Sequence, residues 1–447
     1  MARGVTLGKL AARQAARGAG ARLSMVGRSE RAKEVLADRA AMDAAENLVD
    51  VLGSMKGVAM KVGQAMSVFD LGLVPESRRE EFRAKLAALR DQAPVVSAAD
   101  MRGVIEEDLG PMKAVFSDFD DSPLAAASIG QVHRARLLDG RDVVVKVQYP
   151  GIDAAVRSDV RNMAAAMVLM RALYPSLNTA MIDEITQQLE GELDYLREAH
   201  TQHQVAARYR DHPFVHVPDA VVAHCSPRVL VTDYLDGVGF DDMSAAPQDD
   251  RNIYGELIFR FYVSSLYIDH EFGGDPHPGN VLLCRDGRVG FVDFGLHQRM
   301  DPVHVGLEKA VLCGAVERRA EDVYRLAVER GIVDRRSKVA PRDVLEYVWS
   351  TCDWFLRDEP VCMTAELATT SLVLAMDPTS SEFAAVTRQH LPPEHLFARR
   401  AAFMTAATLG QLAATNNWHR LAREWLYDEP SQTDIGRQIA RWRSSYR

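Results

Sequence analysis

The sequence predicts an α+β fold in which a small antiparallel sheet lies between a helical N-terminal part and a mostly helical lobe. Apolar residues recur at helical spacing in 31–110, alternate with polar residues in two segments between 128 and 148, and return to helical spacing from 302 onward. The chain has 447 residues, of which 47% are hydrophobic. That length suits one such unit with additions at both ends, or about two or three average domains.

Turn and cap signals locate the individual elements. Asp139-Gly140 predicts a hairpin between the two β-type segments, and Ser97-Ala-Ala-Asp100 resembles a capping box at a helix start. The predicted elements are helices within 31–110, strands Ser128–Leu138 and Val143–Gln148, helices over 153–172 and 181–207, a strand Arg228–Tyr234, a helix over 251–270, a loop over 273–280, short strands around 281–283 and 289–292, and only helices from 302 to the end.

Charge is distributed unevenly along the chain. The net charge of −9 argues against nucleic acid as a partner. Residues 1–33, however, hold eight basic residues against the single acid Glu30. Residues 1–30 are therefore interpreted as a flexible basic lead, which is either a solvated tail or an arm that binds a membrane surface or a partner.

Cysteine usage and hydropathy indicate the compartment. The five cysteines are scattered without a CxxC pair, which argues against a disulfide framework or a zinc site and favours a reducing compartment. No signal-peptide core is evident near the N-terminus, and the longest apolar runs, 163–170 and 401–408, are too short to span a bilayer. The expectation is a soluble, cytoplasmic protein, with peripheral contact to the inner face of a membrane left open.

The strongest chemical signal is Asp275-Pro-His-Pro-Gly-Asn280, followed thirteen residues later by Asp293-Phe-Gly295. In protein kinases a catalytic Asp precedes a metal-binding Asn by five positions, and the Asp of a D-F-G motif holds magnesium. Mg²⁺ prefers carboxylate and amide oxygens, which these side chains supply. Asp275 is therefore predicted as a catalytic residue and Asn280 and Asp293 as metal ligands. The alternative is that both segments are ordinary turns.

A second signal is the lysine in Val143-Val-Val-Lys146-Val147. A lysine on an apolar strand is costly unless it meets an anion or a carboxylate, and a kinase strand lysine does both. It could instead be an edge-strand lysine that reaches solvent. The predicted helix 181–207 offers Glu192, Asp194 and Glu198 as partners, and the last two would share one helix face.

Two features of ordinary protein kinases are missing. The segment Ala125-Ala-Ala-Ser-Ile-Gly-Gln131 stands where a glycine-rich phosphate loop would lie, and no Ala-Pro-Glu follows Asp293. Conventional protein-kinase activity is therefore disfavoured. The chain is predicted to be a protein-kinase-like two-lobed fold with an N-terminal helical extension and a mostly helical C-terminal lobe. The predicted parts are a lead, 1–30; the extension, 31–110; the N-lobe, 111–236; and the C-lobe, 237–447.

Together these residues resemble the UbiB/ADCK family of atypical kinases. Lys61-Val-Gly-Gln64 resembles the family's K-x-G-Q motif, Ala125–Gln131 its Ala-rich loop, and Glu192-Leu-Asp194 its E-x-D motif. The D-x-x-x-x-N and D-F-G segments match as well, so the matches run from about residue 50 to residue 300. Gly273-Gly274 departs from the His-Ala of many members, which puts the local loop geometry in doubt. The polar, basic end 437–447 gives no basis for carrying over a membrane anchor.

The resemblance implies binding of ATP or ADP with Mg²⁺, slow ATPase activity and a role in isoprenoid-quinone or other lipid metabolism. It assigns catalytic roles to Asp275, Lys146 and Glu198, with Glu198 pairing with Lys146. Lys61 and Gln64, together with Glu192 and Asp194, would regulate the site from above the nucleotide. The residues assigned to nucleotide binding are Ala125, Ala126, Ala127, Ser128, Lys146, Asp233 and Tyr234.

Two functions follow from this assignment. The favoured one is a Mg²⁺-dependent ATPase or small-molecule kinase that has a lipid or quinone precursor as a further ligand. The alternative is a nucleotide-sensing scaffold that regulates a lipid-biosynthetic complex without turnover.

Overall fold

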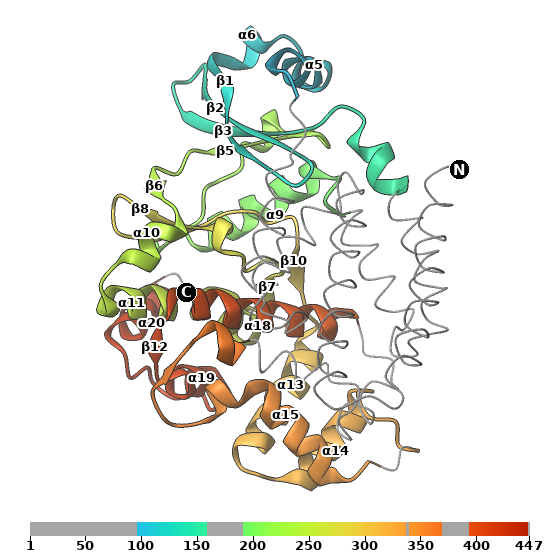
Figure 1. Ribbon diagram of the computed structural model, residues 1–447, viewed down its shortest axis with the longest axis vertical. Coiled ribbons are helices and arrows are strands. Elements are labelled where there is room, and N and C mark those ends of the chain that lie inside the picture. The colour runs from blue at the N-terminus through green and yellow to red at the C-terminus, as the bar shows by residue number, and fades with distance from the viewer. Residues whose placement is uncertain (1–95, 159–190, 337–338, 369–392, 446–447) are drawn as a thin grey trace, which may run out of the picture.

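The computed structural model describes residues 96–158, 191–336, 339–368 and 393–445, which form two lobes around a small central sheet (Figure 1). This arrangement confirms the predicted kinase-like, two-lobed α+β fold. The basic lead 1–30, the K-x-G-Q residues Lys61 and Gln64, and most of the predicted extension 31–110 lie outside the described residues.

The N-lobe is built on a four-stranded antiparallel sheet of order β1-β2-β3-β5. Its strands are β1 (Phe116–Ala126), β2 (Gly130–Leu137), β3 (Asp142–Gln148) and β5 (Val229–Asp233). Strand alternation places Val143, Val145 and Val147 on the buried face, where each is fully shielded from solvent. Lys146 points to the opposite face, as the sequence predicted.

Strand β1 was not predicted. It is an edge strand, and from Ser117 to Ala126 only Phe119 is even partly buried. An edge strand with a solvated row of polar residues shows no alternation of apolar and polar residues, so periodicity cannot reveal it.

Two helices complete the N-lobe core with β3. The helix α5 (Ala98–Leu109) begins at Ser97, whose Oγ accepts a hydrogen bond from the Asp100 amide at 3.1 Å, so the predicted cap is confirmed. Buried side chains of α5 and of α9 (Tyr195–Arg208) belong to the same apolar cluster as the β3 valines. Helix α5 therefore packs as part of the N-lobe, although the predicted boundary assigned it to the extension. The short helix α6 (Met112–Val115) leads into β1.

The predicted continuous helix over 181–207 is interrupted where it can be described. Residues 192–194 are not helical, and α9 starts at Tyr195 with Asp194 as its N-cap. The Asp194 carboxylate accepts a hydrogen bond from the Arg197 amide at 3.1 Å, which is the favoured use of aspartate at a helix start. The prediction that Asp194 and Glu198 share a helix face is therefore wrong: Asp194 is exposed and Glu198 is buried. Of the predicted helix 153–172, residues 153–158 are described and helical.

Short strands between the lobes flank the loops that contain the predicted catalytic and metal-binding residues. One sheet has the order β4-β9-β8-β6, and β7 pairs separately with β10. These elements are β4 (Val215–His216), β6 (Gly237–Val238), β7 (Glu271–Gly273), β8 (Val281–Cys284), β9 (Val289–Phe291) and β10 (His297–Arg299), with 3₁₀ turns η2 (Val222–His224) and η4 (Pro278–Asn280).

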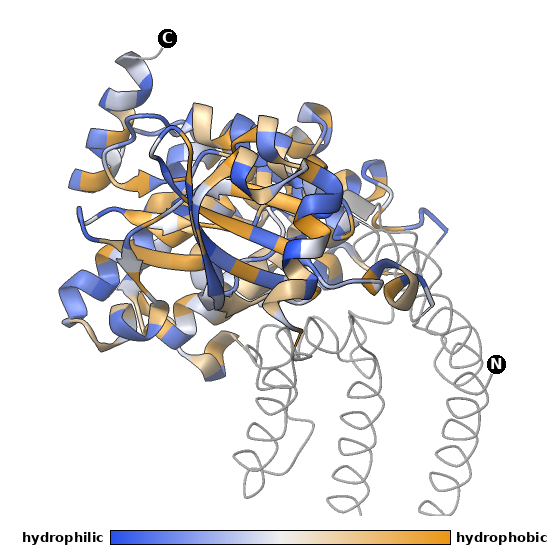
Figure 2. Cartoon of the chain, turned by 90° about the horizontal axis from the view of Figure 1, so that it is seen from above, coloured by the Kyte–Doolittle hydropathy of each residue, from blue (hydrophilic) through white to orange (hydrophobic). Residues whose placement is uncertain are grey.

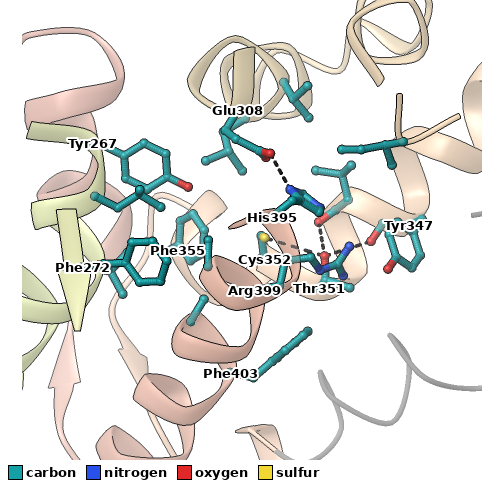
Figure 3. Close-up of a pocket in the computed structure, with 18 of the residues that line it drawn as sticks. Tyr267, Phe272, Glu308, Tyr347, Thr351, Cys352, Phe355, His395, Arg399 and Phe403 are labelled. Carbon is teal, nitrogen blue, oxygen red and sulfur yellow. Dashed lines mark hydrogen bonds and ion pairs between the residues drawn. The ribbon is translucent and has the colours of Figure 1, made fainter. Parts of the chain in front are cut away.

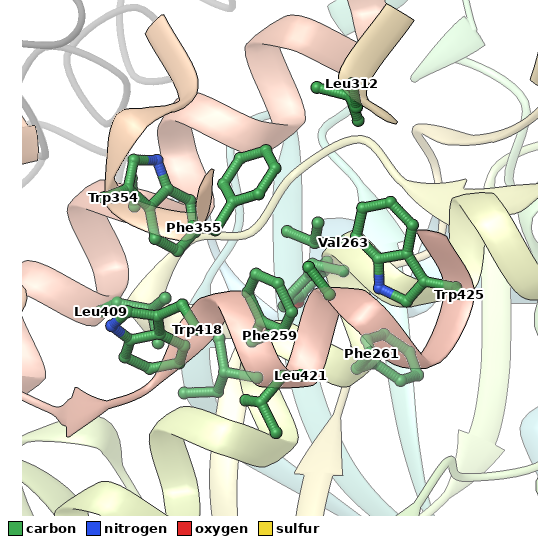
Figure 4. Close-up of a cluster of buried hydrophobic side chains, with 14 of the residues drawn as sticks. Phe259, Phe261, Val263, Leu312, Trp354, Phe355, Leu409, Trp418, Leu421 and Trp425 are labelled. Atoms are coloured by element: carbon green, nitrogen blue, oxygen red, sulfur yellow. The ribbon is translucent and has the colours of Figure 1, made fainter. Parts of the chain in front are cut away.

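The C-lobe is mostly helical and encloses an aromatic core in which Trp418 packs on Phe259 and Trp354, with ring centroids 5.6 and 5.9 Å apart (Figure 4). Its helices are α10 (Phe240–Ala245), α11 (Gln248–Phe259), α12 (Ser265–Asp269), α13 (Pro302–Val316), α14 (Ala320–Glu329), α15 (Pro341–Leu356), α18 (Pro393–Leu412), α19 (Trp418–Leu426) and α20 (Asp434–Ser445). The predicted helix 251–270 contains a π-helical stretch, η3 (Arg260–Ser264).

The prediction of helices alone after residue 302 is wrong in one place. Strands β11 (Val361–Cys362) and β12 (Thr415–Asn416) pair, and the Trp418 indole donates to the Val361 carbonyl at 2.9 Å. Two-residue strands are too short for any periodic signal. Among the described residues no helix is long and apolar enough to cross a membrane, and the helices in Figure 2 interleave hydrophilic and hydrophobic residues.

Candidate nucleotide and metal site

The centre of the candidate site is an ion pair within the N-lobe, between strand β3 and helix α9. The Lys146 ammonium on β3 lies 3.1 and 3.2 Å from the two carboxylate oxygens of Glu198 on α9. The Glu198 side chain is only 4% exposed, and Lys146 also lies over the Tyr195 ring, 4.9 Å from its centroid. The strand–helix pairing that the resemblance implied is therefore present in the described structure.

Burial and charge act against each other at this pair. Burial alone would lower the pKa of Lys146, but the negative charges of Asp293 and Glu198 outweigh it and hold that pKa well above its ordinary value. Burial raises the pKa of Glu198 to about 7, against the attraction of Lys146. Lys146 is thus charged at neutral pH, and Glu198 is a carboxylate that readily takes up a proton when its cationic partner is removed.

The D-F-G segment also contacts the Lys146–Glu198 ion pair. The Asp293 carboxylate lies 3.5 Å from the Lys146 ammonium, and Asp293 has a left-handed backbone with φ of 66°. Aspartate is one of the few residues that adopt this region readily. The Phe294 amide donates to Glu198 at 3.3 Å, while the Phe294 ring is buried in the C-lobe core. Glu198 therefore connects the strand lysine to the backbone of the D-F-G segment.

The predicted catalytic loop is held by contacts along and across the chain. The Asn280 amide nitrogen donates to the Asp275 carbonyl at 3.1 Å, and the Thr408 hydroxyl donates to the Pro276 carbonyl at 2.6 Å. Asp275 itself is 9% exposed, and Arg400 lies 3.9 Å from its carboxylate. Thr408 and Arg400 were missed by sequence reasoning because they lie on α18, more than a hundred residues further along the chain.

Steric constraints account for the two glycines before Asp275. A Cβ on Gly273 would lie 2.8 Å from the Tyr262 ring, and one on Gly274 would lie 2.4 Å from the Leu296 carbonyl oxygen. Larger residues would displace the neighbouring ring or backbone, so this loop depends on both glycines for its close packing. Tyr262, also missed by sequence reasoning, is buried against the loop, and burial together with the charges of Asp275 and Asp293 raises its pKa well above the ordinary value.

The Ala-rich segment forms the tip of the β1–β2 hairpin. Ala125 and Ala126 are the last residues of β1, and the turn is closed by the Ala127 amide, which donates to the Gly130 carbonyl at 2.8 Å. Ser128 donates to the Glu192 carboxylate at 3.3 Å, so the tip of the hairpin contacts the E-x-D segment. These residues lie at the position of a kinase phosphate loop, but their contacts with phosphate remain a prediction.

The other assigned residues are placed as follows. Asp233 ends β5 and Tyr234 begins the linker between the lobes. Their amides already donate to the Asp219 and Asp142 carbonyls at 2.9 and 3.0 Å, so any nucleotide contact would use their other groups. Asp194 caps α9 and does not join the cluster around Lys146.

The donor set fits a magnesium–phosphate group. The hydrogen bond from the Asn280 amide nitrogen leaves its amide oxygen for a cation, and Asp293 supplies a carboxylate. No group of three or more His, Cys, Asp or Glu residues suited to a metal occurs in the described part of the chain. Mg²⁺ in phosphate-transfer sites commonly takes one or two carboxylates and completes its shell with phosphate and water, so two protein ligands suffice.

The fold and this cluster define a protein of the protein-kinase-like class, and the comparisons narrow the class to a family. A family model described as ABC1 atypical kinase-like domain matches residues 88–327. AarF domain-containing protein kinase 1 of Mus musculus is 33% identical over 276 residues, covering 58% of this chain and 52% of the mouse protein. The chloroplastic Protein ACTIVITY OF BC1 COMPLEX KINASE 8 of Arabidopsis thaliana is 32% identical over 286 residues, covering 61% of this chain and 37% of that protein.

A solved structure extends the match over nearly the whole chain. The Mycobacterium tuberculosis protein Rv3197, solved in complex with erythromycin, is 31% identical with a TM-score of 0.63, and the match covers 89% of this chain and all of that one. The chain belongs to the ABC1 atypical kinase-like family, also called UbiB/ADCK. It spans about half or less of the length of the mouse and plant relatives.

Proposed function

We propose that this protein is a Mg²⁺-dependent ATPase or small-molecule kinase. The observation that carries the proposal is the Lys146–Glu198 pair at 3.1 Å with Asp293 3.5 Å from the same ammonium. A phosphate-binding cation, the acid that orients it and a metal-binding carboxylate are the parts that phosphoryl transfer requires.

Each residue has a defined role in this proposal. Lys146, oriented by Glu198, binds the α- and β-phosphates of ATP or ADP. Asn280 and Asp293 hold Mg²⁺, which when bound neutralises phosphate charge. Asp275 accepts the proton of the attacking hydroxyl or water. The Ala125–Ser128 hairpin tip covers the phosphates, and its alanines restrict the backbone more than glycines would, which favours slow turnover.

The acceptor is proposed to be a lipid, a quinone precursor or water. Lys61 and Gln64 would act with Glu192 to exclude protein substrates, and the basic lead would bring this cytoplasmic protein to a membrane surface. Support for an organic ligand in addition to the nucleotide comes from the relative Rv3197, which was solved with erythromycin.

The second candidate is a nucleotide-sensing scaffold without turnover, favoured by the Ala-rich hairpin tip. Single-turnover hydrolysis of radiolabelled Mg-ATP by the purified full chain separates the two. Phosphate release that is lost in Asp275→Asn supports the enzyme. Tight nucleotide binding without release in the wild type supports the scaffold.

Metal dependence is tested with Asp293→Asn. The amide carries no charge for the ion, so the thermal stabilisation by Mg-ATP should disappear while the unliganded protein keeps its circular dichroism spectrum. Asp249→Asn, on the exposed start of α11, is the control and should keep the full stabilisation. An undiminished shift in Asp293→Asn would overturn the metal assignment.

A further inference from the structure

A cavity of about 110 Å³ lies in the C-lobe (Figure 3). Its walls come from η3, α12, β7, α13, α14, α15 and α18, and most of the side chains that line it are apolar or aromatic. Those labelled in Figure 3 include Tyr267, Phe272, Tyr347, Phe355 and Phe403. An apolar cavity of about 150 Å³ holds benzene, so this smaller one suits a ligand portion no larger than about one ring.

One end of the cavity is polar. Glu308 on α13 accepts a short hydrogen bond from the His395 Nδ1 and lies 3.3 Å from the Arg330 guanidinium. Burial would raise the pKa of Glu308, but the charges of His395, Arg330 and Arg399 more than offset this and lower it. Glu308 is therefore an ionised acceptor that holds the His395 ring with Nδ1–H toward it.

The other ring nitrogen of His395 is the unusual feature. His395 is 5% exposed, and its Nε2 has no hydrogen-bond partner in the described structure. It belongs to a side chain that lines the cavity. Buried polar atoms are nearly always hydrogen-bonded, so an unpartnered one at a cavity wall points to a ligand group.

We propose that this cavity binds an apolar molecule of about one ring that carries a hydroxyl group, with the hydroxyl bonded to His395 Nε2. With Nδ1–H donated to Glu308, Nε2 is an acceptor in a neutral ring and a donor in a charged ring, and a hydroxyl group can pair with it in either case. Away from Glu308 and Arg399 the walls are mostly aromatic and aliphatic, which favours an uncharged body for the ligand.

The position of the cavity connects it to the nucleotide site without overlapping it. Phe272 and Tyr262 both line it, Phe272 directly precedes Gly273, and the Tyr262 ring touches the position of a Gly273 Cβ. An occupant would therefore pack against the back of the loop that carries Asp275. The site is distinct from Lys146, Glu198 and Asp293, and the proposal does not depend on the proposed enzymatic function.

Benzyl alcohol and toluene are a matched pair of probes for the full chain. Ligand-observed NMR titration should show both binding, with the alcohol about fivefold tighter, because one hydrogen bond to a buried group contributes a factor of this size. Absence of binding by both probes, or equal affinity for the two, would overturn the proposal.

Two variants locate the binding. His395→Asn keeps an amide donor for Glu308 but removes Nε2, so it should abolish the preference for the alcohol while toluene still binds. Ala402→Leu, at a partly exposed position on α18, fills the cavity and should weaken both probes at least tenfold. Circular dichroism verifies the fold of each variant. An Ala402→Leu protein that is folded and binds both probes like wild type would place them elsewhere and contradict the site.

Discussion

Two clusters in this molecule each combine one cation with two carboxylates, yet their geometries differ. The Arg260 guanidinium donates hydrogen bonds to both carboxylate oxygens of Glu424 at 2.7 Å and to one carboxylate oxygen of Glu256 at 2.8 Å. The Thr433 hydroxyl donates a hydrogen bond to the Glu256 carboxylate at 2.6 Å. Around Lys146, the distances to Glu198 and Asp293 are 3.1 to 3.5 Å.

The difference separates a structural cluster from the cluster proposed to bind the nucleotide. The planar guanidinium meets its acceptors in matched pairs and fills the site, whereas a compact ammonium with looser contacts can turn toward a phosphate. The Arg260 cluster joins η3 to α19 and to the start of α20, so it holds the C-lobe together. The Lys146 cluster joins segments that a nucleotide would also contact. Variants in the two clusters should therefore differ in which property they change.

The largest effect on stability is expected for Arg260→Met. Removing one partner of a buried ion pair costs about 3–5 kcal/mol, since the remaining carboxylates lose their counter-charge. Urea unfolding should show this loss, while the folded fraction keeps its affinity for Mg-ATP. Arg437→Met, which breaks an exposed pair with Asp434, is the control and should cost less than about 1 kcal/mol. Equal costs for the two variants would remove the structural role of Arg260.

Lys146→Met should change nucleotide affinity more than it changes the free energy of unfolding. Nucleotide affinity should fall at least tenfold, or about 1.4 kcal/mol, because the cation proposed to bind the phosphates is lost. Stability should fall less than in Arg260→Met, since Glu198 has a pKa of about 7 and can take up a proton in place of the lysine. Isothermal calorimetry with Mg-ATP and urea unfolding test the two parts. Lys309→Met, at a pair with the exposed Asp428, should change neither strongly. Unchanged affinity in Lys146→Met would refute the functional reading of its cluster.

Gly274→Ala tests the support of the catalytic loop. Its Cβ would meet the Leu296 carbonyl oxygen at 2.4 Å, so we expect a loss of about 1–3 kcal/mol and weaker Mg-ATP binding. Gly103→Ala in the interior of α5, where nothing lies within 4 Å of the new atom, is the matched control. It should stabilise the protein by about 1 kcal/mol because alanine favours the helix. If both variants are equally stable, the close approach at Gly274 is not restrictive.

The smallest effect concerns acid stability at Glu271, which pairs with Arg208 at 2.7 Å and His297 at 3.2 Å. Burial would raise the pKa of Glu271, but His297 and Arg208 lower it to about 2. A depressed pKa gives stability that is present above the unfolded value near 4.5 and is lost as the pH falls toward 2. Glu271→Gln should therefore flatten the fall in unfolding free energy between pH 5 and pH 3, measured by urea titration. A variant that follows the wild-type pH curve would show that this carboxylate is not the titrating group.

Sequence patterns were enough to predict the features whose geometry is local. Alternation along one strand placed Val143, Val145 and Val147 in the core and Lys146 on the other face. The five-residue spacing from Asp275 to Asn280 placed both in one loop, and Ser97 marked a helix start. Such signals can be read because neighbouring positions in a strand, turn or cap have their relative directions set by the backbone alone.

Contacts between distant segments became known only from the folded structure. The bond from Thr408 to Pro276 spans 132 positions, and the need for glycine at 274 arises from Leu296, on the far side of the D-F-G segment. The break before Tyr195 and the unpartnered nitrogen of His395 likewise depend on what packs nearby. None of these features produces a periodic pattern in the sequence. They arise when the chain packs into a dense core, because packing and not sequence proximity then sets the partner of each residue.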